Sequence, residues 1–277
     1  MHTAKPRLRA PAGACDCHIH IYDAAMPLAP TANGPGPAWA DVAAYRAVQS
    51  QLGTSRAIVV QPTAYGTDNS CTLAAIAALG RDETRGIAVV DQGVSDAELA
   101  RLTQAGIAGA RFQMLPGGAI PWEALEPLAA RIADFGWHVQ LQMDGRLLAE
   151  REALLARLPG RLVIDHVGKF LEPVTVDHPG FRALLRLLDN GRTWLKLAAA
   201  YEVSKAGAPL YEDVGALAKA AVAAYPERMV WASNWPHVSV TALPDDAMLL
   251  DLLLDWAPNE ATRRRILVDN PAELYRF

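Results

Sequence analysis

The chain has 277 residues, of which 51% are hydrophobic and 20% charged, as in an ordinary globular protein. Its formal net charge of -4 gives no general attraction for nucleic acid or for an acidic membrane, so an anionic ligand would have to be bound by a few local cations. No stretch approaches the roughly 18 apolar residues of a membrane span, and no apolar run follows the basic N-terminus as it would in a secretory signal.

Three cysteines, Cys15, Cys17 and Cys71, are too irregularly spaced for a disulfide framework. Cys15 and Cys17 lie too close along one extended segment to bridge easily, and no second pair completes a zinc tetrad. We therefore interpret all three as small buried residues. We expect a cytoplasmic enzyme with one domain over residues 1–277, of which residues 1–13 form a flexible leader.

Short apolar runs alternate with longer segments of helical period along the chain. Eight runs predict strands, at 15–21, 56–62, 86–90, 109–114, 138–143, 161–167, 193–198 and 229–234. The segments between and after them predict helices, at 38–52, 69–81, 95–105, 122–135, 148–158, 178–189, 211–224 and 247–268. This alternation predicts an α/β fold, a single (β/α)8 TIM barrel. An open doubly wound sheet is the alternative, but no glycine-rich nucleotide-binding turn follows the first strand.

Two loops are expected near the active site. The segment 23–37 is rich in Pro, Ala and Gly and follows the first predicted strand. Barrel active sites are built from such loops, so we expect it to lie over the site rather than to link two domains. The turn 115–118, LPGG, offers backbone N–H groups to an anion, although Pro-Gly is also an ordinary turn.

The first predicted strand carries the strongest chemical signal. Because side chains alternate along a strand, Asp16, His18, His20 and Tyr22 are predicted to share one face, which points into the barrel. The opposite face, Cys15, Cys17, Ile19 and Ile21, is predicted to pack beneath the helices. Two histidines at a strand end suit metal binding, proton transfer or polarisation of a carbonyl group.

Other polar side chains fall at or just beyond the ends of later strands, which meet at the active-site face of a barrel. They include His166 and His237, so four of the seven histidines lie at this level. Together the polar groups predict a pocket rich in cations and amides that suits carboxylates and hydroxyls; they are Gln61, Arg111, Gln113, Gln140, Gln142, Lys169, Lys196 and Tyr201.

Six segments in order, CDCHIHIYD, GARFQMLPGGA, VIDHVGKF, WLKLAAAYEVS, MVWASNWPH and VDNPAELYRF, resemble the amidohydrolase superfamily. The resemblance is to its branch of small lactone-processing enzymes, the 2-pyrone-4,6-dicarboxylate lactonases and, more nearly, the galactarolactone isomerases. It implies that His18, His20 and His166 form the strand-end polar centre. It also implies that Arg111, Lys169 and His237 are candidates for binding substrate carboxylates.

Asn234 departs from most of the superfamily, which has an aspartate at the end of strand eight as a metal ligand or general base. An amide cannot take a proton from water at neutral pH and is a poor ligand beside a carboxylate. A substrate hydroxyl is then expected to attack the lactone carbonyl, which gives a ring-shifted lactone. The galactarolactone isomerases share this asparagine but lack the first histidine of the pair. His18 is present here, so hydrolysis stays open.

We therefore predict metal-independent isomerisation of a 1,5- to a 1,4-lactone of an aldarate such as galactarate, or hydrolysis of that ester. His18, His20, His166 and Asn234 are predicted to be catalytic, and no cofactor is required. The residues expected to bind substrate are Arg111, Lys169, His237, Gln61, Gln142 and Tyr201.

Two other classes stay open. One is a zinc-dependent amidohydrolase or decarboxylase that binds metal at His18, His20 and His166; the other is a non-catalytic barrel that binds a sugar acid. The expected partner is a small anionic molecule, not nucleic acid or membrane. We expect a monomer or a small homo-oligomer.

Overall fold

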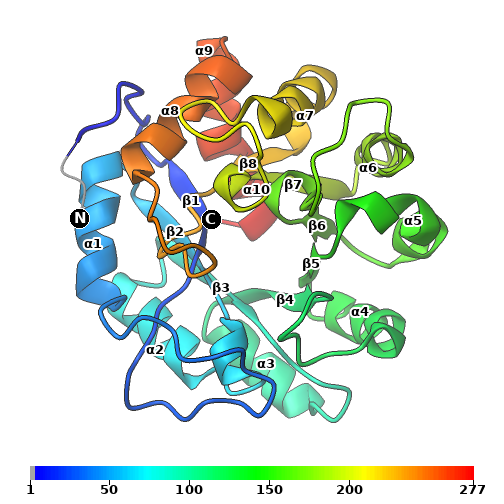
Figure 1. Cartoon of the computed structure of the whole chain (residues 1–277). Coiled ribbons are helices and arrows are strands. Elements are labelled where there is room, and N and C mark those ends of the chain that lie inside the picture. The colour runs from blue at the N-terminus through cyan, green and yellow to red at the C-terminus, as the bar shows by residue number, and fades with distance from the viewer. Residues whose placement is uncertain (1–3) are drawn as a thin grey trace.

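A computed structural model describes residues 4–277. Eight parallel strands follow one another around a single sheet in chain order. They form the inner ring in Figure 1. The strands are β1 Cys15–Ile19, β2 Arg56–Val60, β3 Thr84–Ala88, β4 Ile107–Gln113, β5 His138–Gln142, β6 Leu162–Ile164, β7 Thr193–Leu197 and β8 Met229–Trp231.

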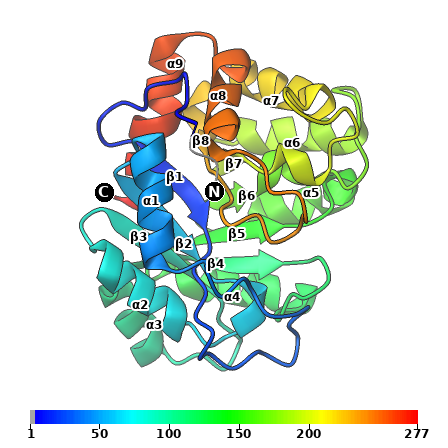
Figure 2. The same ribbon diagram turned by 60° about the vertical axis from the view of Figure 1, so that its left-hand side comes forward.

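Helices surround the strands, and α1 packs beside α8 on the outside (Figures 1 and 2). This arrangement confirms the predicted (β/α)8 barrel. The longer helices are α1 Val42–Leu52, α2 Ser70–Leu79, α3 Asp96–Gln104, α4 Leu125–Ala133, α5 Leu148–Arg157, α6 Pro179–Asp189, α7 Glu212–Ala224 and α8 Asp246–Trp256. No helix of residues 4–277 is long and apolar enough to cross a membrane.

Local sequence explains where several helices begin and end. Ser95 caps α3 by accepting a hydrogen bond from the backbone N–H of Glu98 (3.1 Å). Gly53 ends α1 in the left-handed conformation. In α6, apolar residues recur on one face and are buried, among them Phe181 and Leu184.

The predicted helix 247–268 is wrong as one element. Helix α8 ends at Trp256, and α9 (Glu260–Arg264), a π-helical turn and α10 (Asn270–Tyr275) follow. Pro258 cannot donate a backbone hydrogen bond, and Asn259 begins a new helix by accepting from the N–H of Ala261 (2.8 Å).

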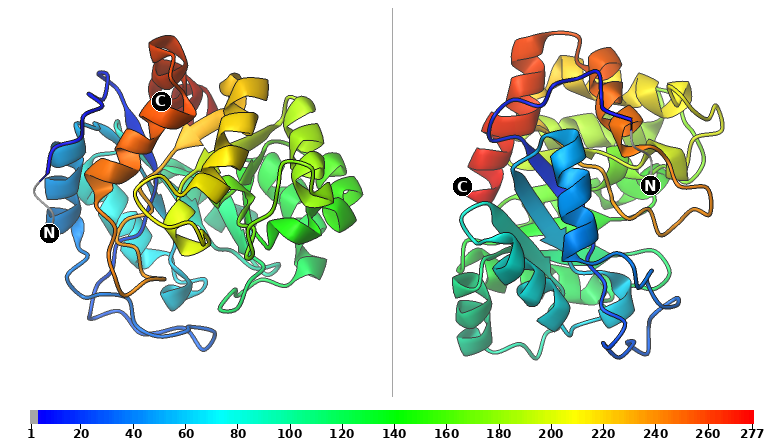
Figure 3. Two further views of the ribbon diagram at one scale, coloured as in Figure 1. Left: turned by 45° about the horizontal axis from the view of Figure 1, so that its top comes forward. Right: turned by 90° about the vertical axis from the view of Figure 1, so that its left-hand side faces the viewer.

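Helix α10 closes the amino-terminal end of the barrel. Tyr275 is fully buried against interior side chains of the strands, including Cys17 and Trp194. The right-hand view of Figure 3 shows this C-terminal segment on one side of the barrel, with the loops that follow β1 and β8 on the other. The carboxyl end therefore remains open to ligand.

Hydrogen bonds across the seam between β1 and β8 complete the ring. The backbone N–H of Asn234 donates to the His18 carbonyl (3.0 Å), and that of His20 donates to the Trp235 carbonyl (2.9 Å). Asp16 strengthens the seam by accepting from the hydroxyl and the backbone N–H of Ser233 (2.6 and 2.9 Å). These bonds fix the position of the β1 side chains along the barrel axis relative to those of β8.

The N-terminal segment lies against α8. The backbone N–H groups of Arg7 and Leu8 donate to the Asp251 carboxylate (3.1 and 2.8 Å), and Leu8 is buried. Residues 1–3 of the expected leader 1–13 lie outside the described residues.

Candidate active site

A cavity of about 250 Å³ lies at the carboxyl ends of the strands. Asn33, from the loop 23–37, and Pro116, from the turn 115–118, line its mouth and are joined by a hydrogen bond (Asn33 Nδ2 to the Pro116 carbonyl, 3.0 Å). The loop therefore lies over the site as expected. The polar residues that line it include His20, Tyr22, Arg111, Gln113, Gln142, His166, Lys169, Glu202 and Asn234.

A larger cavity, about 660 Å³, opens near the opposite end of the barrel. Arg85, Gly106, Trp137 and Tyr275 are among its lining residues, and no histidine of residues 4–277 contributes. Because the chemistry of barrel enzymes lies at the carboxyl ends of the strands, we place the site in the smaller cavity.

A bulge in β1 sets the orientation of its histidines. Relative to β2, β1 has one extra residue between Asp16 and Ile19, which interrupts the alternation of side chains. Asp16 points outward, where it lies 3.4 Å from the Tyr45 hydroxyl of α1. Cys17 and the next residue, His18, both face the interior, where Cys17 packs against Trp194.

The predicted inward face is therefore correct for His18 and His20 but wrong for Asp16. The prediction that Cys15 and Cys17 pack beneath the helices is wrong for the same reason, because both lie in the interior cluster. All three cysteines are buried and unpaired, as expected.

A directed chain of hydrogen bonds orients the two histidines of the first strand end. The Val60 carbonyl can only accept, so His20 Nδ1 donates to it (2.7 Å). Burial lowers the pKa of His20 to about 3, so its ring is neutral and Nε2 carries a lone pair. His18 Nε2, 3.2 Å away, must donate to that lone pair. Burial also lowers the pKa of His18 far below its usual value, so Nδ1 accepts from Lys196 Nζ (3.2 Å).

Lys196 is the centre of a buried polar network below the cavity. Its ammonium contacts Gln140 Oε1 at 2.7 Å and Asp165 Oδ1 at 3.3 Å, and both charged side chains are wholly buried. Burial alone would raise the pKa of Asp165, but the nearby positive charge of Lys196 holds it below its usual value. The carboxylate and the ammonium therefore form a buried ion pair.

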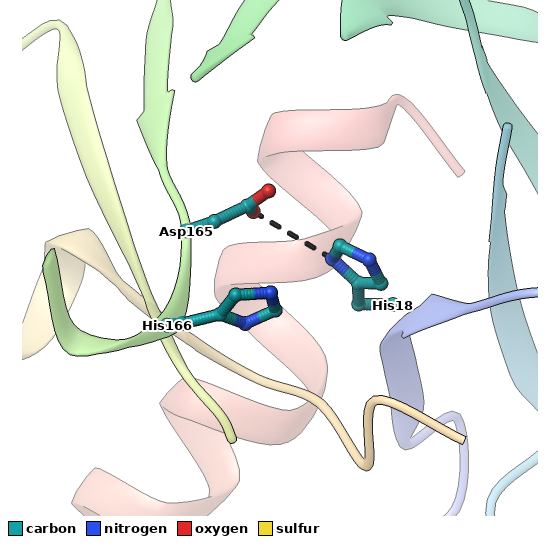
Figure 4. A group of neighbouring side chains, drawn as sticks. All are labelled: His18, Asp165 and His166. Atoms are coloured by element: carbon teal, nitrogen blue, oxygen red, sulfur yellow. Dashed lines mark ion pairs between the residues drawn. The ribbon is translucent and has the colours of Figure 1, made fainter. Parts of the chain in front are cut away.

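The residues His18, Asp165 and His166 form a cluster of potential metal ligands, with ligand atoms within 4.8 Å of one another (Figure 4). Lys196 contacts potential ligand atoms of two of these residues, His18 Nδ1 and Asp165 Oδ1. An ammonium at this position repels a second cation, and it engages the carboxylate that would supply the negative charge of the ligand set. The cluster fits a divalent metal poorly for this reason.

A left-handed turn aims His166 and Lys169 into the cavity. The residues 166–169 have φ values of 57°, 52°, 86° and 49°, and the backbone N–H of Lys169 donates to the His166 carbonyl (2.8 Å). This conformation is costly for the β-branched Val167 and is typical of functional sites. It also ends β6 at Ile164, so the predicted strand 161–167 is too long.

His166 differs from the other two histidines of the centre. Its ring packs against His18 with centroids 4.9 Å apart, but it makes no hydrogen bond to any residue of the described chain, and Nδ1 is buried. Burial lowers its pKa well below the usual value, so it is neutral at pH 7. The ring offers one N–H and one lone pair to a ligand.

Arg111 supplies a fixed positive charge on one wall. Its Nη1 donates to the Gln61 carbonyl (2.9 Å) and its Nη2 to Gln142 Oε1 (3.0 Å). Both polar atoms of the Gln61 side chain have protein partners: the amide nitrogen donates to the Asp68 carbonyl (2.7 Å), and the oxygen accepts from the Thr72 hydroxyl (2.6 Å). Gln61 therefore positions the arginine, and Gln142 reaches the cavity.

A second chain of hydrogen bonds holds the amide of Asn234. The Asp246 carboxylate can only accept, so His237 Nε2 donates to it (3.0 Å). In the tautomer with its proton on Nε2, His237 accepts at Nδ1 from the Tyr201 hydroxyl (2.8 Å), whose oxygen accepts from Asn234 Nδ2 (2.8 Å). Tyr201 and His237 thus lie behind Asn234 and fix its direction.

The structure separates the ten predicted site residues into two groups. Those that line the cavity are His20, His166, Asn234, Arg111, Lys169 and Gln142; those that lie behind it are His18, Gln61, Tyr201 and His237. Both ring nitrogens of His237 have partners within the protein. Its predicted contact with a substrate carboxylate therefore has no support in this geometry.

Glu202 is a cavity residue that the sequence reasoning missed. It follows β7, forms an ion pair with Lys169, and accepts hydrogen bonds from Asn234 Nδ2 (3.1 Å) and the Ser239 hydroxyl. Tyr201 was predicted because it follows the end of the seventh strand, and the same criterion applies to Glu202, the next residue. The expected pocket was poor in acids, and a carboxylate in direct contact with Asn234 changes its chemistry.

Known proteins resemble the chain over nearly its whole length. D-galactarolactone isomerase of Agrobacterium fabrum is 38% identical over 281 residues, which cover 98% of this chain and 94% of that protein. A 2-pyrone-4,6-dicarboxylate hydrolase of Comamonas testosteroni is 33% identical over 285 residues, covering 98% and 93%.

Solved structures show the same fold. An apo crystal structure from Agrobacterium tumefaciens has a TM-score of 0.93 at 39% identity and covers 98% of each chain. A probable 2-pyrone-4,6-dicarboxylic acid hydrolase of Acinetobacter baumannii, with citric acid bound, has a TM-score of 0.83 at 25% identity and covers 96% of this chain and all of that one. The amidohydrolase family model matches residues 15–277. With this match and these relatives, the chain belongs to the amidohydrolase family.

Proposed function

We propose that this protein converts a 1,5-lactone of a small sugar acid such as galactarate into the 1,4-lactone, with hydrolysis of the same ester as the alternative outcome. The observation that carries the proposal is Asn234, which lines a cation-bearing cavity at the strand end where an acid was expected. The relatives support lactone chemistry, since their names specify galactarolactone, 2-pyrone-4,6-dicarboxylate and 4-sulfomuconolactone.

Arg111 is proposed to bind the free carboxylate of the lactone. Its guanidinium is buried, and Nε has no partner among residues 4–277, so a ligand oxygen can gain a charge-assisted hydrogen bond there. Gln142 shares the same wall and suits a substrate hydroxyl. The Acinetobacter structure holds citric acid, a small carboxylate, which agrees with a small anion as the ligand proposed here.

His166 is proposed to polarise the lactone carbonyl. Of the three histidines it alone has an uncommitted N–H, because His20 donates to Val60 and His18 donates to His20. We assign His18 and His20 to positioning: His18 packs against the His166 ring, and His20 holds His18 in place by accepting its Nε2–H. An N–H held against the developing oxyanion stabilises it without reorganisation.

The reaction is proposed to need no metal. The contacts of Lys196 with His18 and Asp165 support this, and the asparagine in place of a strand-eight acid agrees with it. The His18, Asp165 and His166 cluster favours one second candidate, a zinc-dependent hydrolase or decarboxylase. That candidate requires Lys196 to withdraw from the cluster.

We also propose the domain organisation, cellular location, partner and oligomeric state expected from the sequence. We take residues 1–277 as one domain, with a cytoplasmic location and a small anionic molecule as the partner. The net charge of -4 argues against nucleic acid as a partner. A monomer or a small homo-oligomer remains our expectation.

The test follows a panel of aldaro-1,5-lactones by NMR, using protein of measured metal content. We expect the 1,4-lactone to appear faster than without protein, in the presence or absence of chelator. A free acid as the product would indicate the hydrolase, and loss of activity with chelator the metalloenzyme. If no lactone is consumed faster than in buffer, the proposed function is refuted. His166→Ala should abolish turnover, and His178→Ala, outside the cavity, should not.

A further inference from the structure

We infer that Glu202 is a catalytic residue that moves the proton between the attacking and the leaving oxygen of the lactone. The inference rests on the proposed function and deepens it. The sequence places Asn234 at the end of the eighth strand, where most of the superfamily has an acid. The structure places the carboxylate of Glu202 directly beside that asparagine.

Glu202 is held at the cavity wall by three neighbours. Asn234 Nδ2 donates to its Oε1 (3.1 Å), the Ser239 hydroxyl donates to the same oxygen, and the Lys169 ammonium contacts Oε2. Its side chain is 7% exposed. Among the residues that the structure describes, Glu202 is the one carboxylate that lines this cavity.

The other groups near the cavity are less suited to carrying this proton. Asn234 is an amide and has no basic site at neutral pH. Asp165 is wholly buried and paired with Lys196 below the cavity. His18 and His20 use both ring nitrogens in the chain that ends at Val60. His166 keeps one lone pair, but its N–H is assigned to the lactone carbonyl, so Glu202 remains as the anionic acceptor among the described residues that line the cavity.

The fixed asparagine gives Glu202 a defined direction. Tyr201, His237 and Asp246 hold the Asn234 amide so that its N–H groups face Tyr201 and Glu202. The amide therefore orients a neighbouring carboxylate at the place where an acid of strand eight would stand. The missing acid is supplied from the loop after β7 instead.

Glu202 alone can carry the proton through the whole step. The attacking hydroxyl gives its proton to Glu202 as its oxygen bonds to the carbonyl carbon. The tetrahedral intermediate then expels the original ring oxygen, and Glu202 returns the proton to that oxygen. The two oxygens are on neighbouring carbons when a 1,5-lactone becomes a 1,4-lactone, so one carboxylate can serve both. No water, oxidant or metal enters the step.

Glu202→Gln keeps the shape of the side chain and removes the base. We expect kcat to fall by roughly 10²–10⁴-fold, with a much smaller change in KM. Glu172→Gln is the matched control, because Glu172 is exposed and lies outside the cavity. It should retain wild-type kcat.

Chemical rescue distinguishes proton transfer from a structural role. Formate added to Glu202→Ala should restore part of kcat in a saturable manner, whereas Glu202→Asp, which keeps a carboxylate, should exceed the glutamine variant. Wild-type kcat in Glu202→Gln, or a folded alanine variant that formate does not rescue, overturns the inference. If the wild-type protein consumes no lactone faster than buffer does, it is the proposed function that has failed, and if it only hydrolyses the lactone, the isomerising role of Glu202 is overturned.

Discussion

Replacement of Lys196 by methionine tests the buried network beneath the site. The substitution keeps the length of the side chain but removes the ammonium that lies 3.3 Å from Asp165 Oδ1 and 3.2 Å from His18 Nδ1. At an effective dielectric constant of about 20, two unit charges at that first distance attract by about 5 kcal/mol. Removing one partner of a buried pair typically costs about 3–5 kcal/mol, so we expect a loss of that size in the free energy of unfolding.

The assay is equilibrium urea unfolding, followed by circular dichroism and tryptophan fluorescence with coincident transitions required. The double variant Lys196→Met/Asp165→Asn removes both charges and keeps an acceptor for Gln140. We expect it to be more stable than Lys196→Met alone by about 2 kcal/mol or more. A cost below about 1 kcal/mol for Lys196→Met, or additive losses in the double variant, would refute a stabilising ion pair.

The same variant tests the direction of the hydrogen-bond chain. In the wild-type protein, ¹⁵N NMR should show His18 as the tautomer protonated at Nε2, because Nδ1 accepts from Lys196. In Lys196→Met, or in the more stable double variant, this preference should weaken. A His18 ring protonated at Nδ1 in the wild-type protein would contradict the chain.

Three further predictions concern substrate binding, the asparagine and pH. Arg111→Met should raise KM by about 100-fold, since about 3 kcal/mol of charge-assisted bonding is lost, and Arg111→Lys should recover only part of it in steady-state assays. Asn234→Asp places a second carboxylate about 3.1 Å from Glu202 Oε1, so turnover should fall about 10-fold or more and recover as pH is lowered, because two adjacent carboxylates share a proton more readily; a flat pH profile would contradict this. Burial raises the pKa of Asp16 to about 6, so the folded chain holds a proton there between about pH 4 and 6 that the unfolded chain releases. The free energy of unfolding should therefore fall by about 3 kcal/mol as pH rises through that range, and Asp16→Asn should remove this slope in urea titrations.

The fold could be predicted because it depends on patterns that repeat along the chain. Each predicted strand is found, and the strand-end rule places Arg111, Gln142, His166 and Asn234 at one cavity. Errors occur where a local backbone event overrides the pattern. The left-handed turn at 166–169 ends β6 early, and Pro258 divides the last predicted helix.

The inward face of β1 shows why part of the site could not be predicted. A bulge adds one residue to a strand without changing its composition, and alternation then assigns every side chain before the bulge to the wrong face. His18 and His20 follow the extra residue and were placed correctly, whereas Asp16 precedes it and was not. The shift in register appears only when β1 is paired with β2, and the sequence of β1 alone does not show it.

Partners distant in the sequence explain the remaining difference between prediction and structure. The presence of asparagine at 234 suggested a site without a general base, but that inference depended on one strand end. Glu202 is 32 positions away and comes from the neighbouring loop, and the amide of Asn234 donates to it. The sequence shows the same Asn234 whether the residue orients a carboxylate or merely replaces one. The two cases differ in chemistry, because only the first leaves an anionic proton acceptor beside the lactone.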